Sequence, residues 1–369
     1  MKLIASLLGA AGRIVLLSIP LLIIPAEAQT RAYVANTSGT VSLIDTAKNK
    51  VIATIPVGTF PSGIAVTPDG RRVYVANLFN SISIIDTATN SEVLSIPSGQ
   101  FPTALAITPD GTRLYVVNQA LVNGDSTVSI IDTKTSNTIA TIPVGRGPVA
   151  VAITPDGTRA YVTNQQDFFI SVIDTATNEV VTNIPVSGSA GIAITPDGRR
   201  AYVTSPGQGT VFVIDIATNR VAETISLGAN QNPFGVAITP DGTRAYVTIN
   251  ALNMVAVINT ATNTIVATIP VGQRPTGVAV TPDGTRAYVT NDSSNTVSVI
   301  NITTNAVLAS IEVGTGPNAI AISPGVGPPT RKNQCKEDGW RRFNLPRKFR
   351  NQGDCISFVN RRRSERAGD

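Results

Sequence analysis

Residues that could carry out chemistry are sparse in this sequence. Its 369 residues include no histidine, which removes the usual general base near neutral pH and the commonest metal ligand. A Ser-His-Asp triad or a Cys-His pair is therefore excluded, and there is no Gly-x-Ser-x-Gly turn and no phosphate-binding glycine loop before a helix. We expect no catalytic residues and no cofactor.

Calcium is the metal that this composition would still allow, because oxygen ligands are sufficient for it. Asp125, Asp167 and Asp292 are the candidates, but they follow no EF-hand or other spaced loop. Surface aspartates are the favoured interpretation, and we assign no metal site.

The two ends of the chain differ in composition from its middle. Lys2 and Arg13 precede an apolar run that leads to Ala26-Glu27-Ala28, a pattern typical of a signal peptide cleaved after Ala28. A retained anchor is the alternative, although the apolar stretch is shorter than the roughly twenty residues of a membrane span. We expect an exported protein that is secreted, periplasmic or on the cell surface, and not an integral membrane protein.

The C-terminal segment, residues 331–369, holds twelve Lys/Arg and five Asp/Glu, so the net charge of +5 belongs to this tail. Cys335 and Cys355 are the only cysteines, and export favours a disulfide between them. Two interpretations of the basic surplus stay open. It would hold the protein to an anionic polymer of the envelope, or it would only aid solubility. Nothing indicates specific recognition of nucleic acid.

An internal repeat dominates the rest of the sequence. Thr-Pro-Asp-Gly begins at Thr67, Thr108, Thr154, Thr195, Thr239 and Thr281, with a weaker copy at Ser323, and the spacing is 41 to 46 residues. Each repeat contains four short segments in which apolar and small polar residues alternate, separated by turn residues. Four strands in about 42 residues, repeated seven times, predict an all-β, seven-bladed β-propeller with four-stranded blades.

The phrases Tyr-Val-Thr-Asn, Thr-Pro-Asp-Gly and Ile-Pro-Val-Gly resemble the YVTN family of β-propeller repeats, found in exported and surface-layer proteins of bacteria and archaea. The resemblance covers residues 31 to about 324 and weakens where Ser205 and Ile249 replace the asparagine. It implies that the Pro-x-Gly-Val-Ala-Val strand is innermost in each blade. The last blade would then combine three N-terminal strands with an inner strand from the C-terminus, leaving no open edge.

The tail resembles a short two-cysteine module that ends various exported bacterial proteins. The matching residues are Cys335, Trp340, Phe343, Pro346, Phe349, Asn351, Gln352, Gly353, Cys355 and Val359. The predicted organisation is therefore a signal peptide (1–28), the propeller (29–324), a linker (325–330) and a small basic disulfide-bonded tail (331–369).

An arginine stands two residues before every repeat tyrosine, and an Asp or Asn closes every third strand. Antiparallel pairing puts these two positions opposite one another, so we expect each arginine to face its Asp or Asn across the ladder. A repeated structural pair is the favoured interpretation, and a charged ring that binds an ion is the alternative.

The two faces of the ring differ in how much they vary. The connections from the first to the second strand and from the third to the fourth are nearly invariant, and we call their side the constant face. The connections from the second to the third strand, and from the fourth strand to the next blade, form the opposite side, the variable face. Extra residues fall there, in segments 119–126 and 228–234.

Six of the seven phenylalanines outside the tail lie in or beside the variable-face connections. With two arginines they form the predicted ligand-binding face, because loops on a rigid scaffold commonly carry binding sites and aromatic residues dominate interfaces. The predicted residues are Phe60, Phe79, Phe101, Arg146, Phe168, Phe169, Phe234 and Arg274. The alternative is that the rings seal blade junctions.

The sequence therefore predicts a non-catalytic binding scaffold that recognises a protein or glycan of the cell envelope. One alternative is an enzyme similar to propeller lactonases or lyases, with a divalent ion at the channel mouth. It lacks support from the inner strands, which contain no acidic residue. Another is a coat subunit that self-assembles.

Overall fold

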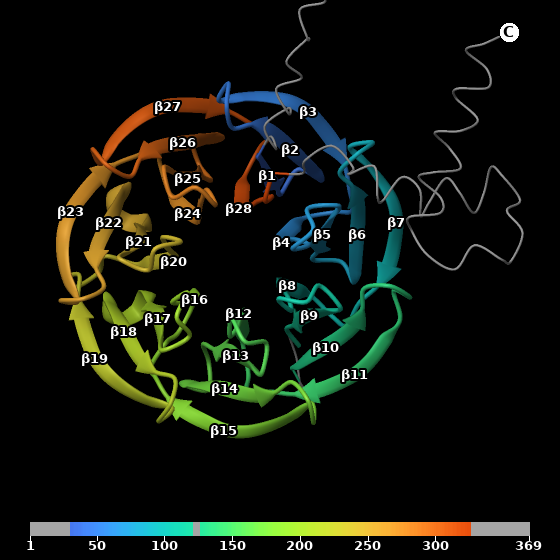
Figure 1. Cartoon of the computed structure of the whole chain (residues 1–369), viewed down its shortest axis with the longest axis horizontal. Helices are drawn as coiled ribbons and strands as arrows, with labels where there is room; N and C mark the ends of the chain where they lie inside the picture. Colours follow the sequence, from blue (N-terminus) through green and yellow to red (C-terminus); the bar gives the residue numbers. More distant parts are fainter. Residues whose placement is uncertain (1–29, 121–125, 326–369) are drawn as a thin grey trace, which may run out of the picture.

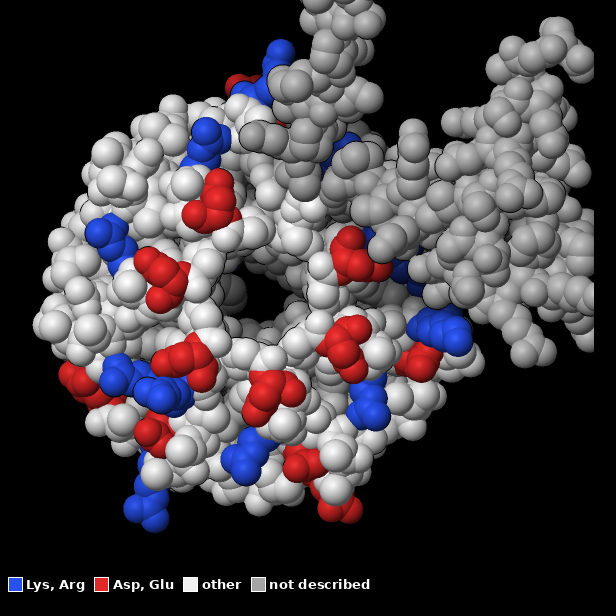
Figure 2. All heavy atoms as spheres, in the orientation of Figure 1, with Lys and Arg blue, Asp and Glu red and all other residues white. Residues whose placement is uncertain are grey.

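Strands occupy most of the part of the chain that the computed structural model describes, residues 30–120 and 126–325. They form seven four-stranded antiparallel sheets arranged as blades of a ring (Figure 1). The space-filling view shows a central channel in this ring (Figure 2). The predicted seven-bladed propeller is confirmed. The predicted signal peptide, the predicted linker after Gly325, the basic tail and its two cysteines lie outside the described residues.

The strands fall into four ranks from the channel outward. The innermost are β4 (Pro61–Val66), β8 (Pro102–Ile107), β12 (Pro148–Ile153), β16 (Ile192–Ile194), β20 (Pro233–Ile238), β24 (Pro275–Val280) and β28 (Pro317–Ile322). The second rank is β1 (Arg31–Asn36), β5 (Arg72–Asn77), β9 (Arg113–Asn118), β13 (Arg159–Asn164), β17 (Arg200–Ser205), β21 (Arg244–Ile249) and β25 (Arg286–Asn291).

The third rank is β2 (Thr40–Asp45), β6 (Ser81–Asp86), β10 (Thr127–Asp132), β14 (Phe169–Asp174), β18 (Thr210–Asp215), β22 (Met254–Asn259) and β26 (Thr296–Asn301). The outermost strands are β3 (Lys50–Pro56), β7 (Ser91–Pro97), β11 (Thr138–Pro143), β15 (Glu179–Pro185), β19 (Arg220–Ser226), β23 (Thr264–Pro270) and β27 (Ala306–Glu312). Two single-turn 3-10 helices, η1 (Pro206–Gln208) and η2 (Asn250–Leu252), lie in variable-face connections.

Blade 1 closes the ring as the sequence predicts. Its strand order is β28-β1-β2-β3, so the inner strand comes from the C-terminal end of the repeat region and the other three from its beginning. Blades 2 to 7 follow in chain order, from β4–β7 to β24–β27.

The apolar core lies between adjacent blades. One cluster joins Tyr33 and Leu43 of blade 1 to Val73, Val75 and Ile85 of blade 2, and equivalent clusters recur around the ring. All seven tyrosines are completely buried in these junctions. No blade can therefore bury its faces without its neighbours.

The residues that recur in every repeat form hydrogen bonds in the turns and at the strand ends, as the fourth blade illustrates. The Gly157 amide bonds the Thr154 carbonyl at 2.8 Å, which is the i to i+3 bond of a β-turn. The Thr154 hydroxyl donates to Asp156 at 2.5 Å, and the Arg159 amide donates to that hydroxyl at 3.1 Å. At the other end of β13, Asn164 donates its amide to the Ser171 hydroxyl of β14 at 3.0 Å.

The predicted strand register of the arginines is confirmed, because each lies opposite its Asp or Asn. The predicted contact between these side chains is wrong. Arg113 lies opposite Asp132, and Arg244 lies opposite Asn259, as predicted. The guanidinium instead crosses to the next blade, where that of Arg113 donates to the Thr175 carbonyl at 2.6 Å. Within the described chain the same bond is made by Arg31, Arg72, Arg200, Arg244 and Arg286. The aspartate is left to accept amides of its own turn, as Asp132 does from Lys134 and Thr135.

Candidate functional site

The predicted phenylalanines divide into exposed and half-buried sets. Phe60, Phe79 and Phe168 are 48%, 56% and 59% exposed, which is unusual for side chains of this size. Phe101, Phe169 and Phe234 are half-buried. A binding partner can therefore reach the side chains of these three exposed phenylalanines without any rearrangement of the propeller.

An aromatic cluster lies on blade 2 and at its junction with blade 3. The rings of Phe60 and Phe79 meet edge to face, with centroids 5.8 Å apart and an interplanar angle of 69°. The Leu78 amide bonds the Phe60 carbonyl at 3.0 Å, and the Phe101 amide donates to the Asn80 side chain at 3.1 Å. The structure therefore brings the Phe60 and Phe79 rings into contact, and it bonds the Phe101 backbone to Asn80, the residue after Phe79.

The Phe169 ring packs as the alternative interpretation predicts, and Phe234 is bonded to the preceding blade through its backbone. The end of the Phe169 ring lies so close to Gly145 that a Cβ there would be 2.6 Å from its Cζ atom. The Phe234 carbonyl accepts the Thr204 hydroxyl of the preceding blade at 2.6 Å. Both residues are therefore strand residues, in β14 and β20, that contact a neighbouring connection or blade.

A left-handed backbone position recurs on the variable face directly before the innermost strand. In the six blades whose innermost strand begins with proline, the residue before that proline has a positive φ. The residues and φ angles are Phe60 (53°), Phe101 (44°), Gly147 (63°), Asn232 (51°), Arg274 (54°) and Gly316 (66°). Glycine and asparagine tolerate this region, whereas phenylalanine and arginine are strained there.

A second left-handed position lies directly before the third strand. Its residues are Gly39, Asn80, Phe168, Gly209, Asn253 and Asn295, and their φ angles lie between 56° and 85°. The side-chain oxygens of the asparagines also accept a backbone amide. The donor is the left-handed residue that precedes the proline of the next blade's innermost strand. Asn80 accepts Phe101 at 3.1 Å, Asn253 accepts Arg274 at 2.8 Å and Asn295 accepts Gly316 at 2.9 Å. Phe168 has a positive φ but no side-chain oxygen to offer.

These exceptions concentrate in the predicted site. In the described chain, positive φ angles at residues other than glycine and asparagine occur at Phe60, Phe101, Ser136, Phe168 and Arg274. Only Ser136 lies on the constant face, and the other four are residues that the sequence analysis selected for different reasons. Residues with a strained backbone conformation of this kind occur commonly at functional sites.

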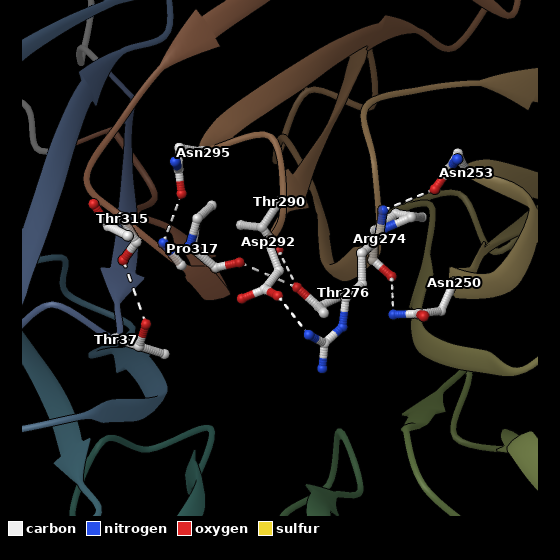
Figure 3. A network of polar contacts seen from close by, with 12 residues as sticks. Thr37, Asn250, Asn253, Arg274, Thr276, Thr290, Asp292, Asn295, Thr315 and Pro317 are labelled. Carbon is white, nitrogen blue, oxygen red and sulfur yellow. Dashed lines mark hydrogen bonds and ion pairs between the residues drawn. The ribbon is translucent and has the colours of Figure 1, made fainter.

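The two predicted arginines form ion pairs with aspartates of the neighbouring connection. Arg146 Nε lies 2.7 Å from Asp167 Oδ1, and the Arg146 amide donates to the other carboxylate oxygen at 2.7 Å. Figure 3 shows the second pair, in which Arg274 Nη1 lies 3.1 Å from Asp292 Oδ2. The hydrogen bond from the Arg146 amide, followed by those from its side chain and by its charge, lowers the pKa of Asp167.

Two of the three calcium candidates are therefore engaged by arginine, and Asp125 lies outside the described residues. No group of three or more potential metal ligands occurs within residues 30–120 and 126–325. The sequence alone did not indicate that these aspartates pair with the arginines, because nothing in the residue spacing reveals the pairing.

Leu252 is a surface residue that the sequence analysis missed. It is 47% exposed at the end of η2, on the variable face of blade 6. In the described chain, the other exposed large apolar residues are the three phenylalanines and aliphatic residues of the outermost strands. The constant-face turns contribute none.

The constant face has a different character. Figure 2 shows acidic side chains around the channel mouth, and the aspartates of the Thr-Pro-Asp-Gly turns directly follow the innermost strands. Those aspartates are Asp69, Asp110, Asp156, Asp197, Asp241 and Asp283. The hydrogen bond from the Thr154 hydroxyl, and then that from the Thr158 amide, lowers the pKa of Asp156, and three other members behave alike. These carboxylates shape turns, and their repetition explains the constancy of this face.

Comparison with known proteins identifies a family. The family described as outer membrane protein assembly factor BamB matches residues 18–225, more than half of the chain. The chain belongs to this family. No curated protein matches the sequence.

Solved structures share the fold. A chain of hydrazine synthase from Kuenenia stuttgartiensis is 26% identical, with a TM-score of 0.67, over 73% of this chain and 91% of that chain. A protein of unknown function from Desulfotomaculum acetoxidans is 18% identical, with a TM-score of 0.70, over 79% of this chain and 98% of that chain. The second likeness shows the fold alone. In the two described stretches, no helix is long and apolar enough to span a membrane.

Proposed function

We propose that the protein is an exported, non-catalytic binding scaffold that recognises a protein or glycan of the cell envelope through its variable face. The observation that carries the proposal is the strain at Phe60, Phe101, Phe168 and Arg274. Corresponding positions in other blades hold glycine or asparagine, so the fold does not require these side chains.

The left-handed backbone at these residues has a substantial free-energy cost. A left-handed conformation costs about 1–2 kcal/mol for a residue with a Cβ atom. Burial would be the usual compensation, but Phe60 and Phe168 are about half exposed. A binding partner that covers the rings supplies the missing compensation, since aromatic residues contribute strongly to interfaces.

The family supports the location and the kind of activity. Its description names a factor in outer membrane protein assembly, which is a role in the envelope that involves other proteins. The resemblance to YVTN repeats of surface-layer proteins favours the same compartment. The proposal therefore combines an envelope location with protein or glycan recognition.

Several observations favour binding over catalysis. The chain has no histidine, and Asp167 and Asp292 are held by arginines. A tightly bound metal that is lost on chelation, together with a ring-opening activity, would favour an enzyme of the lactonase or lyase type instead.

A pull-down tests the proposal. The full chain, and a variant with Phe60→Asn and Phe101→Asn, are each immobilised and exposed to the envelope fraction and culture medium of the producing organism. We expect the wild type to retain a protein or glycan that the variant does not. Ser136→Asn is the matched control, because it relieves a left-handed residue on the constant face. Equal retention by all three chains would refute the proposal.

The basic tail is a separate proposal, based on its surplus of Lys and Arg. It would tether the propeller to an anionic envelope polymer. The full chain should then elute from envelope fragments at higher salt than a chain ending at Pro328. Elution at the same salt concentration would remove this role.

A further inference from the structure

The exposed apolar residues of the variable face lie on separate blades. Phe60 and Phe79 belong to blade 2, Phe168 to blade 4 and Leu252 to blade 6. In Figure 1 the strand pairs β5 and β6, β13 and β14, and β21 and β22 lie on three different sides of the ring, and their connections hold Phe79, Phe168 and Leu252. Phe60 directly precedes β4 of the first of these blades. These four residues, here called the rim anchors, therefore lie on the variable face of three blades that are spaced around the ring.

We infer that the variable face docks one folded protein face-on, across the channel mouth, with the rim anchors as its contacts. This inference rests on the proposed function and narrows its ligand from protein or glycan to a folded protein. A specific protein interface covers about 800 Å² on each partner, which reaches across several blades. A short peptide or a single sugar chain bound to the connections of one blade would contact the anchors of that blade only.

The charge of the face favours this occupant. The charged residues in the described variable-face connections are Arg146, Asp167, Arg274 and Asp292, and each arginine is paired with an aspartate. The described connections therefore have no surplus charge that would attract an anionic polymer or a lipid headgroup. Their complement is a partner surface that is itself neutral, with apolar side chains to place on the anchors.

Hydrogen bonds hold the backbone at or beside three of the anchors, and a rigid partner can match positions fixed in this way. The Val186 amide donates to the Phe168 carbonyl at 2.9 Å, and the Val271 amide donates to the carbonyl of Asn253, beside Leu252, at 2.9 Å. The Leu78 amide fixes Phe60 in the same way at 3.0 Å. A preorganised set of anchors reduces the ordering cost of binding, and a folded partner with matching spacing benefits most.

Leu252 is linked to the strained site through its neighbour. Asn253 accepts the Arg274 amide at 2.8 Å, so the connection that presents Leu252 also fixes Arg274 (Figure 3). The connection that carries the blade 6 anchor is thus bonded to the Arg274 backbone, although no sequence pattern connects the two.

Site-specific photocrosslinking tests the inference in the full chain, in the cells that produce it. Separate variants carry p-benzoylphenylalanine in place of Phe79, Phe168 or Leu252. Controls carry it in place of Thr112 on the constant face or Leu94 on the outermost strand β7, which are both exposed. We expect all three anchor positions to capture the same protein, at separate residues of one surface of that protein, and the controls to capture none of it.

The binding contribution of Leu252 is measured on the captured protein. Leu252→Ser should weaken its binding to the full chain about tenfold, the loss expected for a typical interface anchor. Unchanged binding would overturn the inference.

Other outcomes separate this inference from the proposed function. Capture at Phe79 alone, or capture of a glycan, would overturn face-on docking and leave the binding scaffold intact. Capture of a second copy of the chain would replace docking by self-assembly. If no anchor captures anything and Phe60→Asn with Phe101→Asn leaves pull-down retention unchanged, both proposals are wrong.

Discussion

At the scale of single residues, the main result is a conflict between side chain and backbone. Phe168 occupies a left-handed position at which three other blades place asparagine and two place glycine. It is exposed, so its ring gains little from burial within the chain. Sequence comparison among the repeats can select such a residue as unusual, but only the backbone angle shows that it is also unfavourable.

We predict that Phe168→Asn increases the free energy of unfolding by about 1 kcal/mol. Asparagine tolerates the left-handed region, and its side chain could accept an amide as Asn80, Asn253 and Asn295 do. Denaturant unfolding at equal m-value measures the change. A decrease in stability would show that the phenylalanine ring supports the fold after all.

At the scale of elements, the arginines of the second strand connect the blades. The strand register that places Arg113 opposite Asp132 could be predicted, because antiparallel pairing follows from the repeat itself. The direction of the guanidinium could not, since the carbonyl that it reaches belongs to the next blade. The ion pairs of Arg146 and Arg274 were missed for the same reason: both depend on how separate connections meet in space.

We predict that Arg113→Met lowers the free energy of unfolding by about 2 kcal/mol. The substitution keeps much of the apolar stem and removes the donor to the Thr175 carbonyl, and hydrogen bonds to charged groups contribute about 1.5–3 kcal/mol. Asp132→Asn is the matched control, because the amide oxygen can still accept the turn amides as Asn259 does. A larger effect from Asp132→Asn would restore the cross-strand pair as the important contact.

At the scale of the whole molecule, the ring separates a constant face that shapes turns from a variable face that carries the exposed apolar side chains. The blade number could be predicted from the number of repeats. The closure by β28 and the position of both faces could be predicted from the phase of the repeat together with the strand order that the YVTN resemblance implies. Leu252 could not, since most other blades hold a polar residue at its repeat position, such as Ser38, Asp167 or Gln208, and its exposure depends on the η2 turn.

Alkaline pH should unfold the ring cooperatively. Burial raises the pKa of all seven tyrosines above the ordinary value of 10.0, although the neighbouring arginines oppose this. A phenol with a raised folded pKa contributes stability that is lost as pH rises from the unfolded pKa through the folded one. Tyrosinate absorbance should therefore appear together with loss of strand structure. Ionisation of all seven tyrosines near pH 10.0 without unfolding would contradict this account.

The central claim is that strain on the variable face is retained for binding. The most direct measurement compares the full chain with a variant carrying Phe60→Asn, Phe101→Asn and Phe168→Asn, recording the unfolding free energy and the retention of envelope material on the same samples. The account predicts that the variant is more stable and retains nothing specific, whereas Ser136→Asn retains as the wild type does. A variant that is more stable and binds equally well would show that these side chains have no part in recognition.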